Sequence, residues 1–287
     1  MMSPLQAAAL QDQPLNSPPD APLDAGPLIE TLIDVVQQAG ALILQVYARD
    51  FSVTAKADAS PVTEADQLAE ALITPALQAL LPGVPVVAEE AAAAGQAPAA
   101  AGLGARFWLV DPLDGTREFV QRNGEFTVNV ALVDRGRPVL GLVLAPALGQ
   151  LYAGAIGLGA FTQTGNDGST RRPITARRPP AEGLTVLASR SHGDQAALDA
   201  YLAGQRVAHT RLAGSSLKLC LLAAGEADCY PRFGRTMEWD IAAGQAVLEA
   251  AGGRVETLQG QPLHYGKPGF ENPDFVACGK HAGHASS

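Results

Sequence analysis

The sequence predicts a mixed α/β fold (α+β), and three observations lead to this expectation. In the first eighty residues apolar side chains recur at spacings of three and four, as amphipathic helices require. Residues 125–164 instead alternate or run apolar between glycine-bearing turns, which is typical of a meander of antiparallel strands. Residues 184–250 alternate strand and helix patterns, which indicates a second, smaller α/β layer.

Composition excludes several function classes. The 287 residues carry a net charge of -9, with an isoelectric point near 5.0, which disfavours a nucleic-acid interface but permits divalent metal. Three cysteines without Cys-x-x-Cys spacing argue against a disulfide framework and a zinc site. No apolar run has the roughly eighteen residues of a membrane span, and the start lacks a signal-peptide pattern. We expect a cytoplasmic protein, with peripheral association with the inner membrane and the choice between monomer and homodimer left open.

One compact fold between two tails is the predicted organisation. Residues 1–27 are rich in proline and poor in large apolar residues, which predicts a disordered tail, and residues 280–287 are expected to be a second tail. A polar run at 164–172 is the best boundary within the fold. The N-terminal α+β half, with the metal site, is therefore expected at 28–170, and the C-terminal α/β half, with the substrate pocket, at 171–279.

Two helices and a short strand precede the central strand. The first helix is expected over 28–47, and the second begins near Thr63 and reaches about Leu81. Residues 86–88 are short enough for a strand. The run 91–105 is rich in alanine, glycine and proline, and we interpret it as a flexible flap that could cover a site.

The later elements follow from the same patterns. Strands of the meander are expected at 125–133, 138–144, 150–155 and 160–164. In the second half we expect strands at 184–188, near Val207 and at 227–230, and helices at 194–203, 215–224 and from Met237 to Gly252.

The stretch that carries the chemistry begins with four apolar residues, 107–110, that predict a buried strand. A polar turn would then deliver Asp111 and Asp114 to the carboxyl end of this strand, where open sheets bind ligands. Pro112 restricts the turn between them, so both carboxylates can point into one volume.

Two further residues extend this turn. Gly115 would let a ligand approach the backbone closely, and Thr116 adds a hydroxyl at a helix start whose free N–H groups suit a phosphate oxygen. The alternative is an ordinary polar turn, because Asp, Pro and Gly dominate such turns.

Four acidic positions, Glu89, Asp111, Asp114 and Asp240, each lie where a strand or turn meets the mouth of a sheet or the start of a helix. Oxygen ligands select magnesium, manganese or calcium over zinc. Clustered carboxylates repel one another unless cations neutralise them, so the pattern predicts a metal site. With two Mg²⁺ ions it indicates phosphomonoester hydrolysis by water, since no nucleophile elbow or Walker-type loop is present.

At these positions the sequence resembles the inositol monophosphatase superfamily of magnesium-dependent, lithium-sensitive phosphatases. The resemblance rests on Glu-Glu at 89–90, Asp-Pro-Leu-Asp-Gly-Thr at 111–116 and Trp-Asp-Ile-Ala-Ala-Gly at 239–244. Other stretches resemble its bacterial 3'(2'),5'-bisphosphate nucleotidase branch: Lys-Ala-Asp at 56–58, Ser-Pro-Val-Thr at 60–63, Arg-Asn-Gly-Glu-Phe-Thr-Val-Asn at 122–129, Ser-Arg-Ser-His at 189–192, Gly-Ser-Ser-Leu-Lys at 214–218 and Tyr-Pro-Arg-Phe-Gly at 230–234.

The resemblance implies a layered α/β/α/β/α sandwich and a set of metal ligands. Two or three Mg²⁺ ions would be held by Glu89, Asp111, Asp114, Asp240 and the Leu113 carbonyl, and Li⁺ would inhibit. It also implies that Asp66 and Thr116 orient and deprotonate the attacking water. From the residues alone, Asp66 is better explained as a helix-dipole carboxylate. Asp58 and Glu90 are left with structural roles.

The resemblance further implies how substrate binds. The Gly115 and Thr116 amides would meet the scissile phosphate, beside the ligands Glu89, Leu113, Asp114 and Asp240. A second phosphate and the nucleoside would lie toward Ser191, His192, Ser215, Ser216, Lys218 and Arg232. His192 as a surface-loop residue, Lys218 as a solvated helix lysine and Arg232 as a turn residue are the alternatives left open.

The implied reaction converts adenosine 3',5'-bisphosphate, a small-molecule nucleotide bisphosphate, to AMP and phosphate, in connection with sulfur assimilation. The alternative is an inositol or sugar monophosphatase of the same superfamily, since these enzymes share the metal residues. A non-catalytic regulatory protein is the remoter alternative, because one fold carries unrelated functions.

Overall fold

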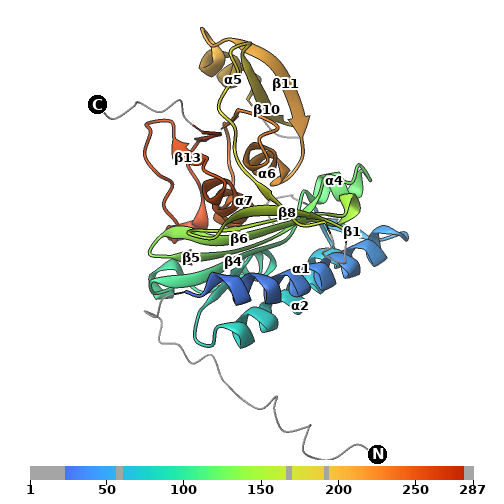
Figure 1. Ribbon diagram of the computed structural model, residues 1–287. Coiled ribbons are helices and arrows are strands. Elements are labelled where there is room, and N and C mark those ends of the chain that lie inside the picture. Colours follow the sequence, from blue (N-terminus) through green and yellow to red (C-terminus); the bar gives the residue numbers. More distant parts are fainter. Residues whose placement is uncertain (1–22, 56–60, 166–169, 191–193, 281–287) are drawn as a thin grey trace, which may run out of the picture.

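Two β-sheets form the frame of the protein (Figure 1). The computed structural model describes residues 23–55, 61–165, 170–190 and 194–280. The larger sheet has seven strands in the order β3-β4-β5-β6-β7-β8-β9, of which only β3 and β4 pair in parallel. Its strands are Val86–Ala88, Arg106–Asp114, Thr127–Asp134, Arg137–Ala145, Gln150–Ala155, Gly159–Thr164 and Arg172–Ile174. The predicted antiparallel meander is confirmed.

The smaller sheet has five strands in the order β11-β10-β12-β14-β13. They are β10 Leu184–Ser189, β11 Val207–Ala213, β12 Cys229–Arg232, β13 Arg254–Thr257 and β14 Phe275–Cys278. β10 pairs in parallel with β11 and β12, while β14 pairs antiparallel with β12 and β13. β13 and β14 were not predicted from the sequence.

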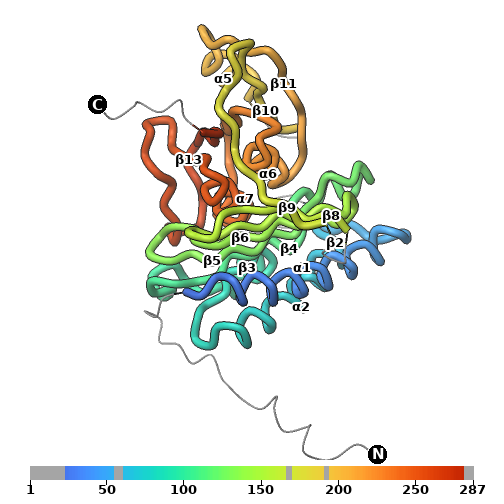
Figure 2. The backbone as a smooth tube through the Cα atoms, in the orientation of Figure 1, coloured from blue at the N-terminus to red at the C-terminus, as the bar shows by residue number. Residues whose placement is uncertain are grey.

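Helices occupy three layers around the two sheets. α1 (Ala25–Tyr47) and α2 (Glu64–Leu80) cover one face of the larger sheet, and α6 (Leu217–Ala223) and α7 (Glu238–Ala250) lie between the sheets. α5 (Gln195–Leu202) packs on the outer face of the smaller sheet through Leu198. Figures 1 and 2 show these layers stacked. The α/β/α/β/α sandwich is confirmed.

α1 begins at Ala25, so the expectation of a tail through residue 27 was wrong at its end. Pro27 lies in the first helical turn, where its missing N–H group is not needed. Residues 1–22 lie outside the described residues. Among the helices described, α1 alone is long and apolar enough to cross a bilayer, with a mean hydropathy of 1.3. Half of that segment is buried, as Leu32 and Val36 are, which is the pattern of a core helix.

α2 starts after a short hairpin of β1 (Val53–Ala55) and β2 (Pro61–Thr63). Thr63 is its N-cap, as expected. The capping box is completed by Asp66, whose Oδ2 accepts from the Thr63 backbone N–H and from Thr63 Oγ1, both at 2.8 Å. Asp66 is fully buried in the first turn. The cap therefore holds this carboxylate in place.

Residues 91–105, expected to be a flexible flap, contain two short helical pieces, although most of their side chains are exposed. Glu89–Ala93 forms the short helix α3, and Ala100–Gly102 forms a 3₁₀ turn. Leu103 is buried, and several alanines of the run pack against the core. Small methyl groups fill shallow space in a core without a strong periodic pattern, so the sequence alone suggested a loop.

β4 continues through the Asp-Pro-Leu-Asp stretch, where a turn was expected. Asp111 pairs with Asn129 of β5 and Asp114 pairs with Thr127, while Pro112 and Leu113 together oppose a single residue. This is a β-bulge, which re-aims side chains without ending the strand. The two carboxylates are thus mounted on a rigid sheet.

Two boundaries also differ from expectation. β9 still pairs with β8, so the larger sheet reaches past the boundary expected at residue 170. At the other end, the Lys280 N–H donates to the Arg177 carbonyl at 2.9 Å, so the second tail does not begin at residue 280. Residues 281–287 lie outside the described residues.

α7 carries Asp240 and packs unusually closely on both sides. A Cβ atom on Gly141 of β6 would come within 2.3 Å of the Ala243 carbonyl oxygen, and a Cβ on Gly244 within 2.7 Å of Leu219. Only small residues fit these contacts, which explains the Ala-Ala-Gly run after Asp240. The position of Asp240 is therefore set by backbone packing against the larger sheet.

Candidate active site

One cavity of about 280 Å³ collects the predicted site residues from both halves of the chain. Its lining includes Glu89, Asp111, Leu113, Asp114, Gly115, Thr116, Ser215, Ser216, Lys218, Arg232 and Asp240. They come from the ends of β3, β4 and β12, the turn before α6, and the starts of α4 (Thr116–Val120) and α7. Ser191 and His192 lie outside the described residues.

The acidic cluster is electrostatically strained. Burial raises the pKa values of Asp111 and Asp240 well above the usual range, and the charges of Glu89 and Asp114 raise both further. Burial also raises the pKa of Asp114, although Lys218 opposes this shift. Glu89 and Asp111 share a hydrogen bond between their carboxyl groups.

The carboxylate oxygens of this cluster suit a hard divalent cation, because such cations prefer oxygen ligands. A bound cation would also relieve the repulsion between the carboxylates. Within the described residues, no group of three or more Asp, Glu, His or Cys side chains is already arranged to hold a metal ion. Glu89, Asp111, Asp114 and Asp240 are the side chains of the cavity that would hold such a cation.

Asp66 lies behind the cavity and reaches it through Thr116. The Thr116 Oγ1 lies 3.4 Å from Asp66 Oδ1 and 3.3 Å from the Leu113 carbonyl oxygen. The other oxygen of Asp66 is engaged in the capping box. Asp66 therefore caps α2, and its other oxygen accepts from the Thr116 hydroxyl at the edge of the acidic cluster. Its role in deprotonating water stays a prediction.

Gly115 has φ of 86°, a left-handed conformation that favours glycine. A Cβ here would meet the Glu125 carbonyl oxygen at 3.2 Å and the Ser215 Cβ at 3.3 Å. The backbone of this turn is therefore pressed against the segment that precedes α6. That contact joins the Gly115 turn of the N-terminal half to the C-terminal half.

Ser216 is buried, and its hydroxyl holds a carboxylate. The Oγ lies 2.8 Å from Asp114 Oδ2 and 2.7 Å from the Asp240 carbonyl oxygen, and it accepts from Asn129 Nδ2 at 2.8 Å. Asn129 was missed as a site residue, although it ends the 122–129 motif. The Ser216 hydroxyl therefore orients the Asp114 carboxylate, and Ser216 also lines the cavity. The contact with substrate expected for Ser216 stays a prediction.

Ser215 has a positive φ of 43°, which is uncommon for a residue with a side chain. Its Oγ is shielded from solvent and has no hydrogen-bond partner within the described protein. A buried hydroxyl of this kind costs free energy unless a ligand or water meets it. Ser215 thus keeps a donor available at the cavity wall.

Lys218 and Arg232 are buried beside the cavity, so the solvated-lysine and turn-arginine alternatives were wrong. Burial lowers the pKa of Lys218 to about 8, and Asp114 opposes the shift. The Lys218 Nζ donates to the Ser215 carbonyl at 2.5 Å and lies 5.3 Å from the Tyr230 ring centroid. Two cations next to an acidic cluster suit a phosphate group.

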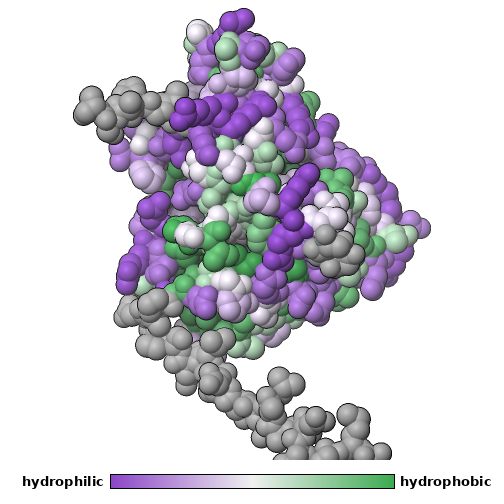
Figure 3. Space-filling view, in the orientation of Figure 1, coloured by the Kyte–Doolittle hydropathy of each residue, from purple (hydrophilic) through white to green (hydrophobic). Residues whose placement is uncertain are grey.

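A second cavity of about 340 Å³ adjoins the first, because Ser189, Tyr230 and Arg232 line both. It lies between the end of β10, the start of α5 and β12, and Phe233 contributes an aromatic wall. In the view of Figure 3, hydrophilic residues predominate in the upper part of the molecule, which belongs to the C-terminal half. Hydrophobic residues gather in the middle of the same view.

Glu125 links the two halves and was not predicted as a site residue. Its carboxylate accepts from Arg190 Nη2 at 2.9 Å, from Arg190 Nε at 3.1 Å and from the Gly214 backbone N–H at 2.8 Å. The signal was available, because Glu125 and Arg190 both lie within matched motifs. Only the fold shows that these motifs meet.

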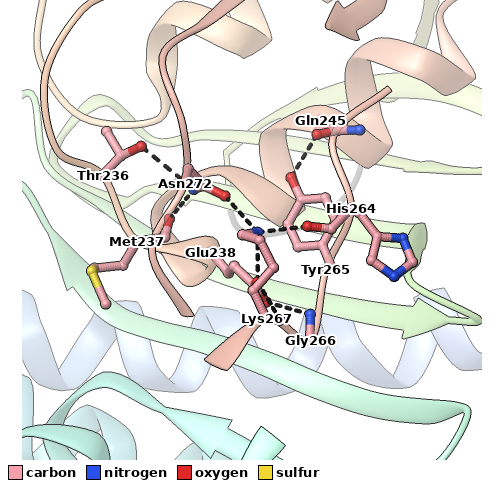
Figure 4. Close-up of polar contacts among 9 residues, drawn as sticks. All are labelled: Thr236, Met237, Glu238, Gln245, His264, Tyr265, Gly266, Lys267 and Asn272. Carbon is pink, nitrogen blue, oxygen red and sulfur yellow. Dashed lines mark hydrogen bonds and ion pairs between the residues drawn. The ribbon is translucent and has the colours of Figure 1, made fainter. Parts of the chain in front are cut away.

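A polar network braces the start of α7 (Figure 4). Glu238 is fully buried and accepts from the Gly266 and Lys267 backbone N–H groups at 2.8 and 2.9 Å and from Lys267 Nζ at 2.6 Å. Asn272 Nδ2 donates to the Met237 carbonyl at 2.8 Å. The segment that presents Asp240 is therefore held on both sides.

Comparison with known proteins agrees with this geometry. The sequence model of the inositol monophosphatase family matches residues 24–285. The chain belongs to the inositol monophosphatase family.

Relatives of this chain within the family include proteins named as 3'(2'),5'-bisphosphate nucleotidases. The 3'(2'),5'-bisphosphate nucleotidase CysQ of Escherichia coli strain K12 is 45% identical over 253 residues, covering 86% of this chain and 98% of the relative. CysQ of Bacteroides thetaiotaomicron has a similar crystal structure, with a TM-score of 0.76, 34% identity and coverage of 90% and 99%. An IMPase of Thermotoga maritima follows with a TM-score of 0.70, 27% identity and coverage of 88% and 92%.

Proposed function

We propose that the protein is a metal-dependent 3'(2'),5'-bisphosphate nucleotidase that converts adenosine 3',5'-bisphosphate to AMP and phosphate. One observation carries the proposal: the acidic cluster shares its cavity with the buried cations Lys218 and Arg232. A monophosphate substrate needs only the acidic cluster, whereas a bisphosphate substrate uses the acidic cluster for one phosphate and the two cations for the other. The relatives named as such nucleotidases support the same substrate class.

Metal ligands in this proposal are Glu89, Asp111, Asp114, Asp240 and the Leu113 carbonyl, which would hold two or three Mg²⁺ ions. When bound, the ions would neutralise the phosphoryl oxygens and lower the pKa of water. Ser216 keeps the Asp114 carboxylate oriented toward the cavity by its 2.8 Å contact. Competition by Li⁺ is expected at these same oxygens.

Proton transfer is assigned to Thr116 and Asp66. The Thr116 hydroxyl lies at the cavity wall and within reach of Asp66 Oδ1, so a proton taken from water at Thr116 Oγ1 can pass to that carboxylate. The capping box fixes the other Asp66 oxygen, which keeps the acceptor aimed at Thr116.

The second phosphate is assigned to Ser215, Lys218 and Arg232, and the nucleoside to the adjoining cavity. Ser215 supplies a hydroxyl that has no hydrogen-bond partner among the described residues, and the two cations supply charge. Ser189 and Tyr230, which line both cavities, lie at the junction between them.

A substrate panel tests the proposal. Adenosine 3',5'-bisphosphate, inositol 1-phosphate and fructose 1,6-bisphosphate are assayed for phosphate release with Mg²⁺, then with added Li⁺. We expect the nucleotide to have the highest kcat/KM and Li⁺ to inhibit. Preference for inositol or sugar phosphate would reassign the protein within its family, and binding of the nucleotide without phosphate release would indicate a regulatory role.

Replacing one metal ligand tests the metal assignment directly. Asp111→Asn should lower kcat by about a thousandfold or more, about 4 kcal/mol of transition-state stabilisation, because a charged ligand is lost. Asp34→Asn, on the exposed face of α1, is the matched control and should be unchanged. Near-normal turnover by Asp111→Asn would refute the assignment.

A further inference from the structure

Two of the three cysteines face each other across the smaller sheet. Cys229 of β12 and Cys278 of β14 are directly opposed in the antiparallel register, and their Sγ atoms lie 3.8 Å apart. The third cysteine, Cys220, is fully buried in α6. Opposed thiols at this separation are in contact but not bonded.

The strand pairing puts the two Cα atoms at a separation that a disulfide can span. The Gly279 N–H donates to the Asp228 carbonyl at 3.0 Å, so Cys229 and Cys278 form the adjoining non-hydrogen-bonded pair. Cα atoms of such pairs lie about 4.5 Å apart, within the range found in disulfides. Side-chain rotation therefore brings the sulfurs together without moving the strands out of register.

The two thiols differ in reactivity. Cys278 is partly exposed, and its pKa is lowered by its hydrogen bond with the Cys229 thiol and by the Arg254 guanidinium. Cys229 is buried, and its pKa is raised by the same hydrogen bond and by burial. Cys278 is thus suited to be the attacking thiolate and Cys229 the resolving thiol.

We propose that Cys229 and Cys278 form a modification site for a peroxide, which closes them into a reversible intramolecular disulfide. The Cys278 thiolate attacks a peroxide oxygen, the O–O bond breaks, and Cys278 becomes a sulfenic acid. Cys229 then attacks that sulfur, its proton leaves with the hydroxyl as water, and the S–S bond forms. Overall, two thiols and hydrogen peroxide give one disulfide and two waters.

The closed site would tie together the segment that carries α7. The linked positions enclose α7 and the brace around Glu238, and β12 continues from Cys229 into Tyr230 and Arg232 of the cavity wall. A cross-link over such a long segment removes freedom from the unfolded chain. The oxidised protein is therefore expected to unfold at a higher temperature than the reduced protein.

The test treats the full-length protein with a small excess of hydrogen peroxide, then counts free thiols in denaturant and maps peptides. We expect the count to fall from the three cysteines of the chain to one, with a peptide that joins Cys229 to Cys278. Dithiothreitol should restore all three and lower the unfolding temperature again. Cys220→Ser, the matched control, should still form the link.

Cys229→Ser and Cys278→Ser should each lose the cross-link and the rise in unfolding temperature, while circular dichroism shows that they fold. Three free thiols after peroxide treatment would overturn the proposal. So would oxidation of Cys278 to sulfinic acid without a cross-link, or a link that joins two molecules.

Discussion

Asp66 serves two neighbours with its two carboxylate oxygens. One oxygen closes the capping box of α2, and the other lies 3.4 Å from Thr116 Oγ1. A helix cap is a rigid support, since it fixes the carboxylate relative to the α2 backbone. An ordinary capping residue thus also holds the hydroxyl of Thr116 at the cavity.

Substitutions at Thr116 separate hydroxyl chemistry from packing. Thr116→Val removes the hydroxyl that lies between Asp66 and the cavity, so kcat should fall about 10²- to 10⁴-fold, the usual contribution of positioned proton transfer. Thr116→Ser keeps the hydroxyl and should retain most of the activity. Steady-state phosphate release measures both, and equal losses in the two variants would contradict a role for the hydroxyl.

Lys218 predicts a pH dependence of substrate capture. Burial lowers the pKa of Lys218 to about 8, so its ammonium group loses the proton as pH rises through about 8. Attraction for the second phosphate is therefore present below that pH and lost above it, so kcat/KM should fall between pH 7 and 9.5.

The matched variant is Lys218→Arg, which stays charged over the same range and should flatten the profile. A wild-type profile that stays level to pH 9.5 would show that the Lys218 charge does not contribute to binding.

At the scale of elements, β4 and α7 deliver the acids by different means. β4 uses a bulge between Asp111 and Asp114, and α7 is set by close contact between Ala243 and Gly141. In both elements the packing of the backbone fixes the position from which the carboxylate side chain projects. The braced loop around Glu238 adds a third constraint at the start of α7.

Gly141→Ala tests the close contact. The new methyl would lie 2.3 Å from the Ala243 carbonyl oxygen, so the variant should lose about 1 to 3 kcal/mol of stability and require more Mg²⁺ for half-maximal activity. Gly102→Ala, with open space around its Cβ, should change stability by about 1 kcal/mol or less. Urea unfolding measures both, and similar values would rule out the proposed constraint.

At the scale of the whole molecule, the site exists only where the two halves meet. Glu125 of the N-terminal half contacts Arg190 and Gly214 of the C-terminal half. The ion pair is partly exposed, so it adds little to stability. Its consequence is geometric, because it sets the Gly214–Ser215 turn against the acidic cluster.

Glu125→Gln should therefore change function more than stability. Weakening a charge-assisted hydrogen bond to the Gly214 N–H should lower kcat/KM about tenfold, with little change in the free energy of unfolding. Glu226→Gln removes a comparable exposed pair with Arg211 and is the matched control. Equal kcat/KM in the two variants would argue against this role for Glu125.

Local patterns were sufficient for the longer elements and for the chemistry of individual residues. The periodicity of α1, the Thr63 cap and the meander strands depend on neighbours in the sequence, so they were predictable. The contacts of Leu103 and of several alanines of the run 91–105 with the core were not predictable, because they depend on distant segments. The contacts of Ser216 could not be predicted for a similar reason, since its partners Asp114 and Asn129 are distant in sequence.

The amino-acid sequence by itself determined which carboxylates could bind a metal and which motifs resemble those of the family. The tertiary structure decided that Asp66 reaches Thr116, that Lys218 and Arg232 are buried beside the acids, and that Cys229 faces Cys278. The physical reason is range: residue type and periodicity act over a few residues. Burial, and the repulsion that adds Glu89 and Asp240 to the aspartates of β4, depend on the packing of segments that are far apart in the sequence.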